Sequence, residues 1–259
     1  MLMPSVCALC GGGCDDVVCA ACRDAYAQGR TMRCARCANP LPTETPSPPR
    51  RRGAKLAAPD THAELGPRLR GDDVEGVATL ICGTCLSFPP AFDATVAAVD
   101  YAIPLDQLVL QLKFGARLAL APWFAHRIRD AMLARPGLPL PDLLCPVPLG
   151  PGRLVERGFN QALEIARPLA AALGVACHPA LALRTLDTPA QSGVAPSVRA
   201  RNVRDAFAVA APDLVEGRHV GLVDDVMTSG HTLGELAATF KRFGAARVTN
   251  FVFARTPPH

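Results

Sequence analysis

The stretch HVGLVDDVMTSGHT, residues 219–232, decides the fold of this chain of 259 residues. It begins with an apolar run of strand length, continues with two adjacent carboxylates and ends in a loop of small residues. Apolar residues then recur with helical spacing at Leu233, Leu236, Ala237 and Phe240. Gly244 occupies a C-cap position, and residues 247–253 again have the composition of a strand. We therefore predict a strand–loop–helix–strand unit whose polar residues lie at the carboxyl end of its first strand, where open α/β sheets bind ligands.

The loop at residues 228–232 predicts a site for a phosphorylated sugar. It offers hydroxyl groups and a glycine that lets the backbone turn its N–H groups inward, and the first turn of the following helix adds unpaired N–H groups. Asp224 and Asp225 repel an anion, but they suit the hydroxyl groups of a sugar, directly or through a bound Mg2+. A simple Ser/Thr helix cap beside two solvated acids is the alternative, and the paired aspartates favour the ligand site over it.

Residues 223–232 resemble the 5-phosphoribosyl-1-pyrophosphate (PRPP) binding motif of type I phosphoribosyltransferases, in which two acids precede Thr-x-Gly-x-Thr. The resemblance implies a three-layer α/β domain with a mainly parallel sheet, in which Asp224 and Asp225 contact the ribose. It also implies that the loop holds the 5-phosphate through Thr228, Ser229, Gly230, His231 and Thr232. Hypoxanthine-type members carry an aspartate at the position of Thr228 that assists the purine base, and this chain lacks it.

Four Cys-x2-Cys pairs near the start of the chain predict metal sites. A two-residue gap lets two thiolates converge on one ion, and two such pairs complete a tetrahedral Zn2+ site. Eight cysteines therefore supply two structural zinc sites. Sequential pairing would place Cys7, Cys10, Cys19 and Cys22 on one ion and Cys34, Cys37, Cys82 and Cys85 on the other; an interleaved pairing stays open. The spacing favours metal over disulfides or a redox pair, and with it a reducing cytoplasm.

Composition divides the chain into two predicted domains. Residues 1–90 form a double zinc-ribbon domain with little apolar sequence, so a chelator should unfold it and spare the rest. Residues 91–259 form the phosphoribosyltransferase-like domain. Within the first domain, residues 41–77 are rich in proline and charge and are predicted to be a mobile insertion. No apolar run reaches the ~18 residues needed to span a bilayer, and the first residues lack a signal-peptide pattern.

The second domain carries two further candidate site residues. Residues 143–148 read as a short strand, and the Pro/Gly-rich loop after it holds Arg153 and Arg157 before an Ala-rich helix that ends at Gly174. If this strand lies beside the Asp224 strand, both arginines face the pyrophosphate of the same ligand. Residues 184–207 form a long polar segment with several arginines, and two readings stay open: a loop that closes over an anionic ligand, or a mobile surface connection.

Further motifs make the chain similar to the ComF family over nearly all of its length except about residues 41–77. The four Cys-x2-Cys pairs, residues 146–148, residues 157–161, residues 201–203 and the PRPP loop follow in the order found there. The resemblance implies a cytoplasmic double zinc-ribbon protein with a phosphoribosyltransferase-like domain and a role in natural competence. The partners it implies are single-stranded DNA and a competence helicase or other DNA-processing proteins, without membrane insertion.

The sequence leaves two functions open. One is a protein that binds PRPP or a related ribose phosphate and contacts DNA; 24 of the 27 basic residues are arginines, which pair well with phosphate, although a GC-rich genome also favours arginine. The other is an active phosphoribosyltransferase. In that case Asp224 and Asp225 stabilise the developing charge of the ribose, and Arg153 and Arg157, with Mg2+, assist departure of pyrophosphate.

Overall fold

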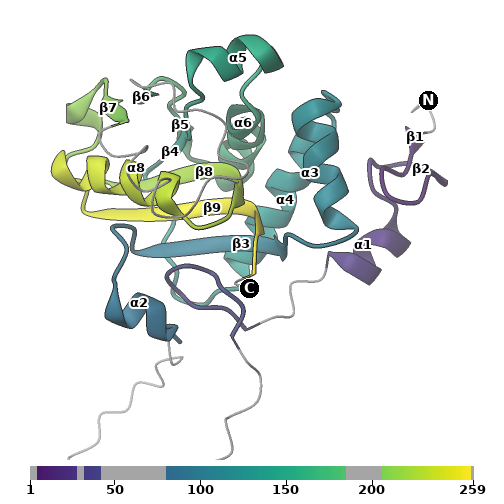
Figure 1. Cartoon of the computed structure of the whole chain (residues 1–259), viewed down its shortest axis with the longest axis horizontal. Helices are drawn as coiled ribbons and strands as arrows, with labels where there is room; N and C mark the ends of the chain where they lie inside the picture. Colours follow the sequence, from purple (N-terminus) through teal and green to yellow (C-terminus); the bar gives the residue numbers. More distant parts are fainter. Residues whose placement is uncertain (1–4, 28–31, 42–79, 185–205, 258–259) are drawn as a thin grey trace, which may run out of the picture.

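The computed structural model describes residues 5–27, 32–41, 80–184 and 206–257 (Figure 1). Five parallel strands form the central sheet in the order β3-β9-β8-β4-β5. Their bounds are Ala94–Asp100 for β3, Leu143–Pro146 for β4, Ala176–Cys177 for β5, His219–Met227 for β8 and Arg247–Arg255 for β9. The fold class expected from the sequence is confirmed: two groups of four cysteines precede an α/β body with a parallel sheet.

Helices cover both faces of the sheet because successive side chains of a strand point to opposite sides. On one face, α3 (Leu105–Phe114), α4 (Leu120–Leu133) and α6 (Gln161–Leu173) enclose an apolar cluster in which the ring of Phe124 stacks on that of Phe253, with centroids 3.6 Å apart. Helix α8 (His231–Arg242) covers the other face and packs on a second cluster. The single tryptophan, Trp123, is buried in the first cluster.

One expectation for the region after β4 is wrong. The arginines at 153 and 157 do not lie in a loop, because residues Pro151–Arg157 form a short helix, α5. Proline at the first helical position has the φ angle that a helix start requires. Gly158, with a φ of 75°, ends α5, and the Asn160 side chain then caps α6 by accepting a hydrogen bond from the Ala162 N–H.

Strands β4 and β8 are neighbours, and the chain leaves them in opposite directions across the sheet. From β4 it passes through α6 to β5, and from β8 it passes through α8 to β9 on the other side. The carboxyl ends of such a strand pair form a crevice in which open α/β sheets bind ligands. The pairing is close: a Cβ atom on Gly221 of β8 would lie 2.4 Å from Cδ2 of Leu144 on β4.

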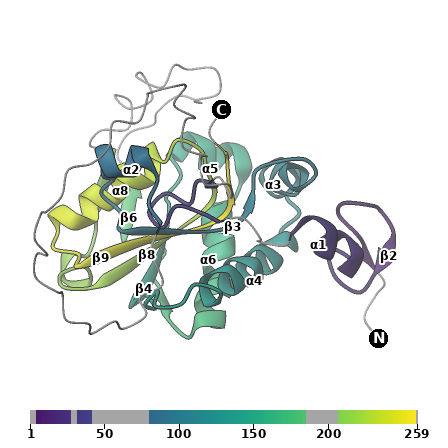
Figure 2. The ribbon, with the colours of Figure 1, turned by 90° about the horizontal axis from the view of Figure 1, so that it is seen from below.

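The first cysteine unit lies beside α3 and α4 in both views (Figures 1 and 2). It consists of the paired strands β1 (Ser5–Val6) and β2 (Gly13–Cys14) and the helix α1 (Ala20–Tyr26). Two side chains of the body hold its backbone: Gln111 donates to the Ala8 carbonyl at 3.0 Å, and Arg117 donates to the Val6 carbonyl at 2.8 Å. The unit is therefore joined to the body by polar contacts as well as by apolar packing.

The second cysteine unit combines residues 32–41 with α2 (Gly83–Ser87) and packs on the face of the sheet that α8 covers. The remaining described elements are β6 (Ala182–Arg184), which pairs antiparallel with β7 (Phe207–Val209), and the 3-10 turn Pro212–Leu214. Apart from their ends, the expected insertion at 41–77 and the polar segment at 184–207 lie outside the described residues. No helix in the described ranges has the length and apolarity to cross a bilayer.

Candidate functional site

A cavity of about 680 Å³ opens at the carboxyl ends of β4 and β8. Six of the residues predicted from the sequence line it together: Arg153, Arg157, Asp224, Asp225, Thr228 and Thr232. The parallel pairing of β4 with β8 explains this, because it brings α5, which follows β4, to the same sheet edge as the two aspartates. Ser229, Gly230 and His231 are not among the residues that line the cavity.

The two aspartates lie in β8, shortly before its end at Met227, and their surroundings differ. Asp225 is buried, with a side chain only 3% exposed, and its Oδ2 pairs with Nζ of Lys113 at 2.7 Å. Asp224 lines the cavity and is partly exposed. The charge of Asp225 is thus neutralised by Lys113 of α3. Asp224 lines the cavity, and among the described residues it has no cation within 2.7 Å.

Burial, together with the negative charge of Asp225, raises the pKa of Asp224 to about 8. The charge of Lys113 acts in the opposite direction and is outweighed. Two adjacent carboxylates sharing one cation are costly in an empty cavity. Such an arrangement is typical of a binding site whose ligand supplies the missing hydrogen-bond donors or cations.

The raised pKa predicts a specific pH dependence of stability. The folded-state pKa of Asp224 lies above the unfolded value, so the folded chain keeps a proton that the unfolded chain releases. The contribution of this group to the free energy of unfolding is therefore most favourable at low pH and falls as the pH rises toward 8. Asp224→Asn removes this penalty. We expect the variant to melt higher than the unchanged protein by roughly 5 °C at about pH 9, and by roughly half as much at about pH 6. Melting curves that differ equally at both pH values would contradict the assignment.

The loop after β8 turns directly into α8. Gly230 precedes the helix with a φ of 81°, and a Cβ there would lie 2.5 Å from Cε of Met227, so only glycine fits. The Ser229 hydroxyl and the His231 ring nitrogen Nδ1 lie 3.0 Å apart. Thr228 and Thr232 line the end of the cavity at the N-terminus of α8, a helix of 12 residues. Hydroxyl groups beside the first-turn N–H groups of a helix are suited to phosphate.

The opposite wall comes from α3 and α5, and only the two arginines of α5 were predicted from the sequence. Lys113 and Phe114 end α3, and Arg157 donates to the Gln161 amide oxygen at 2.8 Å while its guanidinium lies 5.2 Å from the Phe114 ring centroid. Lys113 belongs to no recognisable motif. One signal was available: the chain uses only three lysines beside 24 arginines, so a lysine at the end of an amphipathic helix stands out.

A buried arginine, Arg255 at the end of β9, connects the ligand loop to the second cysteine unit. Its Nε donates to the Cys37 carbonyl at 2.9 Å, and its Nη1 donates to the carbonyls of Met227, at 3.1 Å, and of Thr228. The side chain is only slightly exposed. One guanidinium thus fixes the backbone of both segments, a contact that no sequence motif predicts.

The eight predicted cysteine ligands form two groups, and their pairing is the sequential one. Within each group the sulfur atoms all lie within 4.8 Å of one another. Cys10 and Cys19 sulfurs are 3.9 Å apart, and Cys37 and Cys82 sulfurs are 3.6 Å apart. A tetrahedral ion with metal–sulfur bonds of about 2.3 Å requires sulfurs about 3.8 Å apart, so both groups fit a metal ion.

Backbone amides support the thiolate form in both groups. The N–H of Cys19 donates to the sulfur of Cys7 at 3.3 Å, and that of Cys82 donates to the sulfur of Cys34 at the same distance. Burial raises the pKa of Cys7, but hydrogen bonds from backbone N–H groups outweigh it and lower the pKa to about 6. Cys14 is a member of neither group, and its thiol instead contacts the Asp16 carbonyl.

Comparisons with known proteins find relatives whose names refer to DNA utilization or to competence. The chain is 40% identical to the DNA utilization protein YhgH of Salmonella typhi over 184 residues, which is 70% of this chain and 80% of that protein. It is 38% identical to YhgH of Escherichia coli K12 over 180 residues, 68% and 78% of the two chains. It is 32% identical to Competence protein F of Haemophilus influenzae over 179 residues, 67% and 78% of the two chains.

Two solved structures show a more distant likeness. Glutamine phosphoribosylpyrophosphate amidotransferase from B. subtilis matches with a TM-score of 0.33 and 20% identity, over 53% of this chain and 26% of that one. A purine phosphoribosyltransferase from Pyrococcus horikoshii matches with a TM-score of 0.28 and 17% identity, over 62% and 87% of the two chains. No protein-family model matches the chain.

Proposed function

The chain belongs to the ComF family, together with DNA utilization protein YhgH and Competence protein F, and from this membership we propose that it binds a ribose phosphate while it takes part in DNA uptake and use. The ligand that fits best is PRPP or a related ribose 5-phosphate. The single observation that carries this proposal is the cavity in which paired carboxylates, a hydroxyl-bearing loop at a helix N-terminus and two arginines meet.

Each part of the cavity matches one part of that ligand. The N-terminus of α8 and the loop 228–232 suit the 5-phosphate, and Asp224 and Asp225 accept hydrogen bonds from ribose hydroxyls. Arg153 and Arg157 suit a pyrophosphate at the other end of the sugar. Mg2+ would accompany the pyrophosphate and spread its charge, since hard phosphate and carboxylate oxygens are the ligands it prefers.

For the two cysteine groups we propose Zn2+, because four thiolates at tetrahedral spacing are the donor set of structural zinc sites. A structural site with four cysteines leaves no open position for a substrate, so the metal would serve folding and not chemistry. Free thiolate ligands also require a reducing compartment, and we therefore propose the cytoplasm as its location.

Calorimetric titration of the metal-loaded chain with PRPP in the presence of Mg2+ tests the proposed ligand. We expect saturable binding at one site, with ribose 5-phosphate binding more weakly because it lacks the pyrophosphate that the arginines and Mg2+ would contact. Glucose 6-phosphate serves as a control for phosphate attraction alone. Equal affinity for glucose 6-phosphate and PRPP would show that the cavity does not recognise the pentose.

An active phosphoribosyltransferase is the second candidate, and the cations around the cavity favour it. Lys113, Arg153 and Arg157 all line the cavity that Asp224 and Asp225 share. In such a reaction the bond between C1 of the ribose and pyrophosphate breaks, a nitrogen nucleophile bonds to C1, and its proton is released. Release of pyrophosphate from PRPP that depends on an added nucleobase or amine, and that Asp225→Asn abolishes, would favour the enzyme. Binding of PRPP without such release would favour the binding protein.

A further inference from the structure

A second cavity, of about 410 Å³, lies where both cysteine units meet the body, and it shares no lining residue with the first. It is bounded by α1 of the first cysteine unit, by β3 at the edge of the sheet, by α4 and by Arg33 of the second cysteine unit. Its polar lining residues are Arg23, Asp24, Arg33, Thr95, Arg127, Asp130 and Arg135.

Three separate segments supply the four arginines of this cavity. Arg23 directly follows Cys22, a member of the first cysteine group, and Arg33 directly precedes Cys34, a member of the second. Arg127 lies on α4, and Arg135 follows the same helix. Each metal group thus fixes the position of one arginine, and the body supplies two more. Cations outnumber the two aspartates of the lining, so the cavity is electropositive.

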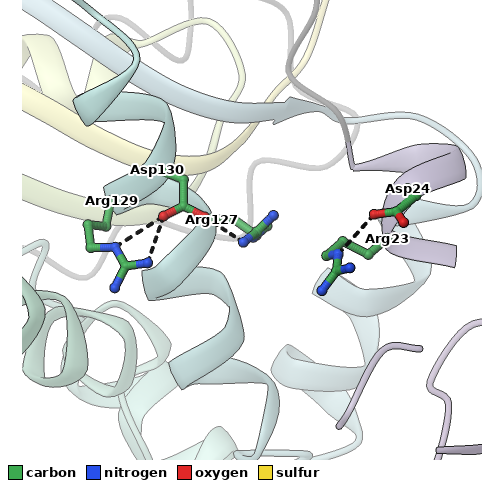
Figure 3. Close-up of polar contacts among 5 residues, drawn as sticks. All are labelled: Arg23, Asp24, Arg127, Arg129 and Asp130. Carbon is green, nitrogen blue, oxygen red and sulfur yellow. Dashed lines mark hydrogen bonds and ion pairs between the residues drawn. The ribbon is translucent and has the colours of Figure 1, made fainter. Parts of the chain in front are cut away.

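The ion pairs in the cavity leave guanidinium N–H groups available. Figure 3 shows Arg127 on α4 and Arg23 on α1 extending into the space between the two helices. Arg23 pairs with Asp24 through Nε at 3.0 Å, and Arg127 shares the carboxylate of Asp130 with Arg129. A guanidinium has five N–H donors, and each pair uses only a few. The buried Nε of Arg127 has no hydrogen-bond partner among the described residues.

The second pair of arginines is held more firmly. Arg135 donates to the Thr95 carbonyl at 2.6 Å and to the Ala35 carbonyl at 3.2 Å, and Arg33 pairs with Asp100 at 2.8 Å. These contacts fasten the loop of the second cysteine unit to the open edge of β3. Arg23 and Arg127, with side chains 40% and 25% exposed, can therefore rearrange toward a ligand, whereas Arg33 and Arg135 form a fixed wall.

The lining indicates what kind of anion fits. Guanidinium groups bind phosphate with two parallel hydrogen bonds, so arginine suits a phosphate better than a lysine cluster would. The apolar part of the described lining consists of alanines and one valine and has no aromatic ring on which a base could stack. A ligand recognised through phosphate and not through its bases is the backbone of a nucleic acid.

We propose that this cavity, between α1, α4 and β3, binds a backbone phosphate of DNA. The proposal rests on the proposed function only in taking DNA as the partner, and it does not depend on PRPP. It assigns a task to both metal groups: each holds one arginine of the phosphate site. Strand binding therefore requires metal in both groups.

Binding of a fluorescein-labelled oligothymidine to the metal-loaded full chain, measured by anisotropy over a range of salt concentrations, tests the proposal. Arg23→Ala with Arg127→Ala should lower the slope of log K against log salt by about 1.4, because each lost phosphate contact on a single strand contributes about 0.7. Affinity should then fall on the order of twentyfold at about 0.1 M salt. Arg23→Ala alone, at an exposed position, should give half the change in slope without risk to folding.

Arg167→Ala is the matched control, because Arg167 is an exposed helical arginine in an i,i+3 ion pair with Glu164, outside this cavity. It should leave strand affinity unchanged. Inorganic phosphate and a mononucleotide, added as competitors, distinguish a strand-specific site from one for any phosphate: displacement by either at equal phosphate concentration would overturn the assignment to a strand.

PRPP titration of the same variants separates this proposal from the proposed function. Unchanged PRPP binding with weakened strand binding supports the cavity as the DNA contact. Wild-type strand affinity and salt slope in the double variant would overturn the inference and leave the ribose-phosphate proposal intact. If the unchanged protein does not bind PRPP but binds the strand in a way that depends on Arg23, the ribose-phosphate proposal is refuted and the DNA site at this cavity is supported.

Discussion

Asp225→Asn is expected to weaken PRPP binding by roughly 10- to 100-fold, because hydrogen bonds to a charged group contribute about 1.5–3 kcal/mol. The substitution keeps the shape of the side chain and removes its charge. The partly buried ammonium of Lys113, 2.7 Å away, then lacks its counter-charge, so the variant should also be less stable. Calorimetry with PRPP and Mg2+ measures the first effect, and thermal melting measures the second.

A double variant separates the two consequences. Lys113→Met with Asp225→Asn removes both charges of the buried pair, and we expect it to recover stability but not PRPP affinity. Asp106→Asn is the matched control, since Asp106 is an acid on the same helix as Lys113 that does not line the cavity. An Asp225→Asn chain that folds and binds PRPP with unchanged affinity would sink the proposed role of the acid pair.

Loss of metal from the second cysteine group is expected to have the largest effect on stability. Apparent binding energies of structural Zn2+ reach about 10 kcal/mol or more, comparable with the whole stability of a domain. Cys85→Ser should therefore lose one metal ion and lower the melting temperature by roughly 10 °C or more. Cys34, Cys37 and Cys85 are buried in the same apolar cluster as α8, so their loss should disturb the sheet and not only the cysteine unit.

The first group should behave differently. Cys10 is exposed, and Cys10→Ser should release one metal ion and open residues 5–27 to protease while the parallel sheet stays folded. Cys14→Ser is the control, because Cys14 belongs to neither group and the variant should retain both metals. Elemental analysis gives the metal content, and limited proteolysis with melting curves gives the stability. A Cys85→Ser chain with the melting temperature of the unchanged protein would contradict the packing argument.

The contact between Arg255 and Cys37 extends this prediction to the ligand site. Arg255 holds the carbonyls of Cys37 and Thr228 at once, so disorder in the second cysteine unit should loosen the loop expected to bind phosphate. From the sequence we expected a chelator to unfold residues 1–90 and spare the rest. The packing now leads us to expect weaker PRPP binding in the chelated protein too, measurable by the same calorimetric titration.

Sequence alone determined those features that depend on short-range spacing. The helical spacing of Leu233, Leu236, Ala237 and Phe240 identified α8, because an amphipathic helix repeats its apolar residues every three or four positions. Two-residue gaps between cysteines identified all eight members of the metal-binding groups. The acid pair and the loop after it were recognisable because adjacent residues carry the chemistry of that part of the cavity.

Tertiary structure decided everything that depends on which distant segments meet. Chain topology decides that the cysteines group sequentially and that β4 lies beside β8. It also brings Lys113 to a carboxylate 112 positions away. Local spacing carries no information on these contacts. The helix α5 was missed because Gly158 and Pro151, which read as loop residues, here end and begin a helix. The arginine cavity is the extreme case, because its four arginines come from segments up to 112 residues apart and only packing brings them together.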